Sequence, residues 1–236
     1  MNETSITRWI GAGLLGLPLY GALTFWSSMN PQPDPNTRYD AWARFVTTDH
    51  YVITHVFGSI LGLVFAIFGT FALGVYLADG RAGRMGLVAA VLTVLGSALF
   101  LTVGGVSAFA VPEEGQAYLA GIEGFDGLPT SLADNALTAT FALSILLIFA
   151  GNTMLGAAVW LSGKLPRWTG ALWTAAAVSM YPLSAVVIAV TGAQSTPPTV
   201  LAGALLVVAG GAWMAWSVLR RPAAETVGVQ TRPSIQ

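Results

Sequence analysis

Long apolar stretches separated by short polar segments make up most of the sequence. Each stretch runs for about 20 residues or more with almost no charge, which is enough helix to cross roughly 30 Å of hydrocarbon. We therefore predict an all-α polytopic membrane protein, a bundle of six transmembrane helices that forms one domain over residues 1–220. The predicted spans cover about residues 8–28, 51–78, 86–110, 136–162, 168–192 and 198–219.

The composition narrows the class of protein further. Charged residues make up 9% of the chain and hydrophobic residues 55%, whereas a soluble domain carries about 25% charged residues. The absence of Cys excludes disulfides, Cys-ligated zinc, iron–sulfur clusters and thiol catalysis. A net charge of −1 gives no basic surface for nucleic acid. The expected partner is the lipid bilayer, and a second membrane protein or another copy of the chain stays open.

Lys and Arg are distributed unequally between the two sides of the predicted bundle. Cytoplasmic loops carry the excess of these residues in membrane proteins. We therefore expect a multi-pass protein of the plasma membrane with both termini in the cytoplasm. Eight of the ten cations fall on the predicted inner side (Arg8, Arg81, Arg84, Lys164, Arg167, Arg220, Arg221 and Arg232), and the other two are Arg38 and Arg44.

The polar segments differ in length and character. The first outer segment contains "NTRYDAWARFV", in which Tyr39 and Trp42 recur at helical spacing. We predict a short helix at the outer membrane interface with these rings at headgroup level, and a lid over an outward cavity is the alternative. Residues 111–135 are expected to form a flexible, solvated acidic loop. Residues 221–236 are expected to form a disordered cytoplasmic tail.

The first span could be mistaken for a secretory signal, because a single Arg precedes its apolar run. The stretch "LTFWSSMN" offers no clear small-x-small cleavage site. We therefore expect this span to be retained as a helix, with a kink caused by Pro18.

Both histidines lie in "TTDHYVITHVFG" at the start of the second span. On an α-helix, five residues correspond to about 500°, so His50 and His55 point about 140° apart. That spacing does not suit chelation of one metal ion, which favours i,i+3 or i,i+4 pairs, unless a π-bulge intervenes or the helix begins after His50. His50 is interpreted as an interface residue. His55 lies deeper, where an ionisable group usually faces other helices.

Small residues follow His55 along one helical stripe: Gly58, Gly62 and Gly69. Such stripes mark close helix packing, so we expect His55 to face a neighbouring helix and predict a ligand site around His55, Tyr20, Thr102 and Tyr181. A purely structural hydrogen bond from His55 is the alternative. The candidates at similar depth for that bond are Tyr20, Thr24, Thr102, Ser107, Thr138, Tyr181 and Ser184.

Few other polar residues are embedded. Asn152 in the fourth span is predicted to hold helices together. The spans contain no Asp, Glu, Lys or Arg at mid-depth, which argues against a proton-coupled pump or a voltage sensor.

These patterns favour a non-enzymatic membrane protein: a binder of small molecules or lipids, a transporter-like protein, or an accessory subunit of a membrane complex. We predict no catalytic residue, no metal ligand and no cofactor. The rival hypothesis is a metal- or haem-dependent redox or hydrolytic protein that uses His55 and the outer carboxylates.

Overall fold

The computed structural model describes residues 3–122, 132–192 and 195–220. This part of the chain is helical, with no strand, and it contains six segments long and apolar enough to cross a membrane. The prediction of an all-helical chain with six such segments is confirmed. The predicted tail, 221–236, and part of the acidic loop lie outside the described residues. The six segments are Arg8–Ser27, Asp49–Leu77, Gly83–Leu119, Asn135–Ser162, Arg167–Thr191 and Pro198–Leu219.

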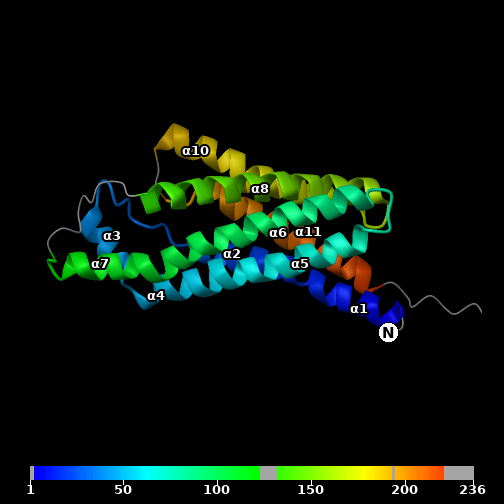
Figure 1. The fold of residues 1–236 in the computed structure, drawn as a ribbon, viewed down its shortest axis with the longest axis horizontal. Coiled ribbons are helices and arrows are strands. Elements are labelled where there is room, and N and C mark those ends of the chain that lie inside the picture. Colours follow the sequence, from blue (N-terminus) through cyan, green and yellow to red (C-terminus); the bar gives the residue numbers. More distant parts are fainter. Residues whose placement is uncertain (1–2, 123–131, 193–194, 221–236) are drawn as a thin grey trace, which may run out of the picture.

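The spans are divided into shorter helices, three of which are π-helical segments (η). Figure 1 shows them arranged as one elongated bundle. We call the end that carries α3 and α7 the cap end, and the opposite end, where residues 3 and 220 lie, the terminus end. The elements are α1 (Glu3–Leu14), α2 (Gly16–Ser27), α3 (Tyr39–Val46), α4 (Asp49–Ile53), η1 (Thr54–Leu61), α5 (Gly62–Leu77), α6 (Gly83–Gly105), η2 (Val106–Ala110), α7 (Val111–Leu119), α8 (Leu132–Ser162), α9 (Arg167–Val178), η3 (Ser179–Leu183), α10 (Ser184–Thr191) and α11 (Pro198–Leu219).

The six spans close into a ring. Around it, α2 packs against α5, α5 against α6, α6 against α8, α8 against α9, α9 against α11, and α11 against α2. The break between α1 and α2 falls at Leu15, three residues before Pro18. Proline has no N–H to donate, and its ring clashes with the preceding turn of a helix, which accounts for this break.

Apolar side chains fill the terminus-end half of the ring. The residues that are fully buried there include Leu73, Leu77, Leu155 and Met214, from three different spans. Burial of such side chains is the main packing contribution of this half. The cap-end half of the ring is not filled in the same way, and it contains the cavity described below.

The predicted stripe of glycines faces α2. A Cβ added at Gly69 would lie 2.6 Å from Leu17 Cδ2 and 2.9 Å from its backbone nitrogen. A Cβ at Gly58 would meet the side chain of Ser27, whereas at Gly62 the nearest atom, Leu23 Cβ, is 3.6 Å away. The stripe therefore contains two positions without room for a methyl group and one with room.

We expect Gly69→Ala to destabilise the protein by about 1 kcal/mol, since overpacking typically costs about 1–3 kcal/mol. Gly62→Ala is the matched control on the same helix, and we expect no loss from it. Thermal unfolding in detergent measures both. Equal stability of the two variants would contradict the difference in packing between these glycines.

The cap end contains a small layer of its own. The third span continues through η2 into α7, so the acidic stretch expected to be a flexible loop begins instead as a helix.

The predicted helix of the first outer segment is present as α3, but Trp42 is only 5% exposed and packs in the cluster between α3 and α7. The Tyr39 hydroxyl donates to Glu114 Oε1 at 2.9 Å, and Gly115 lets α3 approach closely, because a Cβ there would lie 3.0 Å from Ala43 O. This ring therefore has protein contacts from α7, and its level relative to the headgroups stays a prediction.

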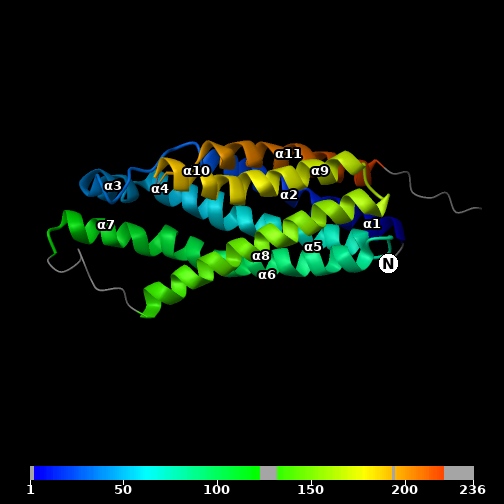
Figure 2. The same ribbon diagram turned by 90° about the horizontal axis from the view of Figure 1, so that it is seen from above.

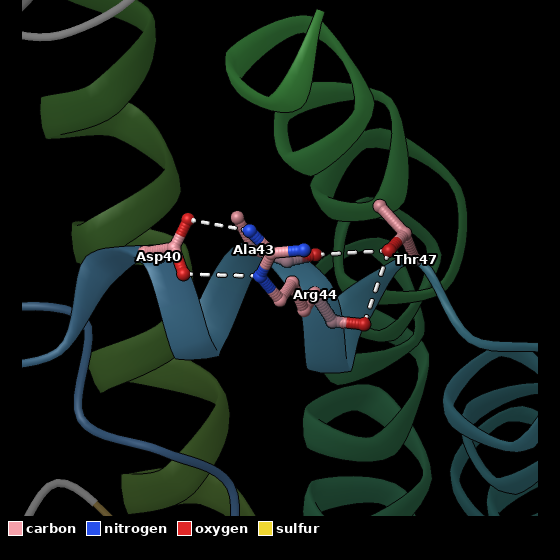
Figure 3. A network of polar contacts seen from close by, with 4 residues as sticks. All are labelled: Asp40, Ala43, Arg44 and Thr47. Carbon is pink, nitrogen blue, oxygen red and sulfur yellow. Dashed lines mark hydrogen bonds and ion pairs between the residues drawn. The ribbon is translucent and has the colours of Figure 1, made fainter.

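Polar contacts on the opposite face of α3 are local (Figure 3). Arg44 Nε donates to Asp40 Oδ2 at 3.0 Å, and Thr47 Oγ1 donates to Ala43 O at 3.0 Å. The hydrogen bond and the charge of Asp40 raise the pKa of Arg44. Because both side chains of this ion pair are more than 60% exposed, solvent screens it and it stabilises α3 only weakly.

Candidate functional site

A cavity of about 700 Å³ lies in the cap-end half of the ring. All six spans contribute to its wall, and its size is within the range of roughly 300–1,000 Å³ typical of small-molecule sites. Its lining residues are Tyr20, Thr24, Ser27 and Ser28; Gly58, Ser59 and Leu63; Phe100; Phe141, Ala142, Ile145 and Ile148; Met180, Tyr181, Ser184, Ala185 and Ile188; and Ser195, Thr196, Pro197 and Val200.

One wall of the cavity is rich in hydroxyl groups. Tyr20, Thr24 and Ser27 lie four and three residues apart, which places them on one face of α2. Tyr181 comes from η3 on the other side of the ring. The side chains of Tyr20, Thr24 and Tyr181 lie close to one another. These hydroxyls can donate to or accept from a bound molecule.

The opposite wall is apolar. It consists of Phe100 on α6 with Phe141, Ile145 and Ile148 on α8, and the rings of Phe100 and Phe141 pack with centroids 5.8 Å apart. The described lining residues include no Asp, Glu, Lys, Arg or His. Since a charge in such surroundings would have no counter-charge, this cavity suits an uncharged molecule.

Two π-helical segments border the cavity. Ser59 projects from η1, and Tyr181 from η3, which also contains Pro182. Hydrogen bonds fix η3 and the start of α10 to α11: Ser179 Oγ donates to Thr199 O at 2.8 Å, and the hydroxyls of Ser184 and Thr199 are 2.6 Å apart. Single π turns occur frequently at functional sites, and here they set the direction of side chains in the cavity wall.

His55 does not line the cavity. Its Nδ1 lies 2.9 Å from the backbone oxygen of Tyr51, and since a carbonyl only accepts, this nitrogen carries the proton. The ring also packs on that of Tyr51, with centroids 3.9 Å apart. The hydrogen bond of His55 therefore stays within its own span. The π-helix that starts at Thr54 changes the directions in which the following side chains point, relative to the regular α-helix of 3.6 residues per turn assumed for the sequence.

Among the other predicted site residues, the structure brings Tyr20 and Tyr181 together, and Thr24 and Ser184 line the same cavity. Thr102 does not line it: its side chain is exposed, and Oγ1 donates to Leu99 O in the same helix at 2.6 Å. Ser107 and Thr138 also lie outside the lining set. Sequence reasoning missed Ser27, although its spacing from Tyr20 and Thr24 is a signal that could have found it.

His50 belongs to the cap end. The Asn30 side-chain amide donates to His50 Nε2 at 2.7 Å, which links the end of the first span to the start of the second. Within residues 3–122, 132–192 and 195–220, no group of three or more His, Cys, Asp or Glu side chains lies in a position to hold a metal ion.

Asn152 connects two helices. Its Oδ1 accepts a hydrogen bond of 2.8 Å from Trp173 Nε1 on α9, and its Nδ2 donates to Ile148 O at 2.9 Å. Trp173 is 3% exposed, so Asn152 provides the hydrogen-bond acceptor for a buried indole N–H.

Comparisons of the chain with protein-family models, with curated proteins and with solved structures find no match. The function is therefore argued from the cavity itself.

Proposed function

We propose that this protein binds an uncharged amphipathic small molecule or lipid, without chemical conversion, in the cavity at the cap end. The observation that carries the proposal is that the hydroxyl-bearing side chains of Tyr20 and Tyr181 lie close together in the cavity, opposite an apolar wall of Phe141 and Ile145. Small-molecule sites typically combine apolar walls with a few polar groups that fix orientation. The absence of acidic, basic and imidazole groups from the described lining favours binding over acid–base chemistry.

A photoactivatable long-chain alcohol that carries a diazirine is a suitable probe in phosphatidylcholine vesicles. We expect it to label peptides of α2, α8 and η3. Tyr20→Phe and Tyr181→Phe should each weaken binding roughly fivefold, since one hydrogen bond contributes about 1 kcal/mol. Tyr118→Phe, in the cap outside the cavity, is the control and should bind as the wild type does. Labelling confined to other helices would refute the proposed site.

We also propose that the protein lies in the plasma membrane, with the terminus end and both termini in the cytoplasm. The cations at that end support this orientation. Five exposed tryptophans at that end support its position at a membrane interface, since both interfacial belts are rich in this residue. Arg167 lies 5.6 Å from the ring centres of two of them, and Arg220 lies 3.6 Å from the ring of a third. The five are Trp9, Trp160, Trp168, Trp213 and Trp216.

The chain contains no Cys, so single cysteines report orientation directly. A membrane-impermeant maleimide added to intact cells should react with Asn36→Cys in the segment before α3. It should not react with Asp79→Cys between α5 and α6 until the membrane is permeabilised. Both positions are accessible at the surface, and the second substitution leaves every cation in place. The reverse pattern of reaction would invert the proposed orientation.

A further inference from the structure

The wall of the cavity between α8 and α10 has an opening to the side. Phe141 and Ala142 of α8, and Ala185 and Ile188 of α10, line the cavity and are themselves exposed at the surface. Phe141 is 44% exposed and Ile188 39% exposed. Figures 1 and 2 show that the cap-end part of α8 and α10 diverge from each other. We call the four residues and the gap between them the seam.

Among the described residues, little protein surrounds the part of α8 beside the seam. Its exposed residues between 135 and 146 fall on several faces of the helix, and Leu143 and Leu146 are 48% and 62% exposed. Apolar side chains exposed within a membrane span contact the hydrocarbon of the bilayer. In the proposed orientation, acyl chains of the outer leaflet would therefore lie directly against the seam.

The other border of the seam, α10, has its main packing contacts among the described residues with η3 and α11. It is separated from α9 by η3, in which Pro182 lacks an N–H for the helix ladder. Its side chains Val186 and Val190 are 55% and 80% exposed. Its polar attachment to α11 is the Ser184–Thr199 pair at its first residue.

The polarity of the lining residues increases from the seam to the interior of the cavity. The seam itself is apolar, so a hydrocarbon chain crosses it at no electrostatic cost, whereas a charged headgroup would lose its hydration without gaining a counter-charge. Beyond the seam lie the hydroxyls of Tyr181 and Tyr20, which can satisfy an alcohol or carbonyl group. The apolar seam thus favours entry of uncharged molecules with a hydrocarbon chain, and the hydroxyl groups of the cavity can bind their polar end.

Resting on the proposed binding function, we infer that the ligand is a membrane lipid with an uncharged, oxygen-containing polar end, and that it enters the cavity sideways from the outer leaflet through the seam between α8 and α10. The polar end lies against Tyr20 and Tyr181, and the hydrocarbon lies along Phe141 and Ile145.

The test closes the seam after folding. In the Cys-free chain, Ala142→Cys and Ala185→Cys are combined and joined with a cleavable bis-maleimide in phosphatidylcholine vesicles, and the same variant capped with N-ethylmaleimide is the unlinked control. The probe is the diazirine alcohol. If the two cysteines are linked before the probe is added, labelling of the cavity should fall at least fivefold. If they are linked after the probe is added, the probe already bound should stay in the cavity and label it. Cleavage of the linker should allow the probe to enter again. As a second approach, Ala142→Trp and Ala185→Trp should each slow labelling.

The possible failures separate the two claims. Absence of cavity labelling in the wild-type protein would overturn the proposed binding function. Normal labelling of the wild type with no effect of linking or of either Trp variant would leave binding intact and overturn the sideways route. Equal labelling by a diazirine fatty acid, whose end is a carboxylate, would overturn the assignment to uncharged lipids.

Discussion

Gly170→Ala is expected to cause a large loss of stability. A Cβ at this position in α9 would meet the backbone oxygen of Gly156 on α8, and it would lie 2.9 Å from Trp160 N and 3.2 Å from Val159 Cβ. Two of these three atoms belong to the backbone, so no change of rotamer relieves the clash and the helices must separate. We expect a loss of about 3 kcal/mol, the upper end of the usual range for overpacking, and a fall in Tm on the order of 6–12 °C.

Gly210→Ala is the matched control for this prediction. It is also a buried glycine in a helix–helix contact, but the nearest atom to an added Cβ, Leu172 Cβ, is 3.4 Å away. Thermal unfolding of the two purified variants in the same detergent gives the comparison. A Tm for Gly170→Ala within about a degree of the control would show that α8 and α9 are not in backbone contact at this point.

Asn152→Leu is expected to have the next largest effect. Leucine has a similar size, so the substitution removes the acceptor for Trp173 Nε1 and leaves this N–H buried without its partner. An unsatisfied buried donor costs about 1–3 kcal/mol, and hydrogen bonds between membrane helices contribute about 0.6–2 kcal/mol. We therefore expect the free energy of unfolding to fall by about 2 kcal/mol.

The neighbouring residue provides the control. Thr153 is also half-buried, but its hydroxyl donates only within α8, to Phe149 O at 2.8 Å. Thr153→Val should therefore lower the free energy of unfolding by much less, as measured by urea or thermal unfolding in detergent. If both variants lost the same amount, the contribution of Asn152 would be local to its helix and not a connection to α9.

The spans were predictable because the bilayer imposes length and apolarity on each segment separately. Predicted and observed bounds agree within a few residues for the last two spans, Arg167–Thr191 and Pro198–Leu219. The third helix continues past the predicted end of its span at residue 110, since Glu113 and Glu114, which look like the start of a loop, lie in the first turn of α7. The hydrogen bond from Tyr39 to Glu114 depends on α3, which is distant in the sequence.

The site was less predictable. Tyr20 and Tyr181 were selected for their depth, and the ring closure that brings them together depends on contacts among all six spans. His55 was placed by extrapolating a regular α-helix through Thr54–Leu61, where the structure has a π-helix. Periodicity cannot detect such a segment, since no residue type marks it.

The π-helical segments carry a consequence for how sequences of this kind diverge. A π turn accommodates one residue more than an α turn at nearly the same rise. Loss of a single residue within Thr54–Leu61 would therefore be absorbed by a return to a regular α-helix, because a turn with one residue fewer leaves the two flanking helices at nearly the same relative angle. Tyr51, now 2% exposed in the cap cluster, would keep its direction toward α3. A homologue with a one-residue gap in this segment would thus keep both the packed half of the ring and the attachment of its cap.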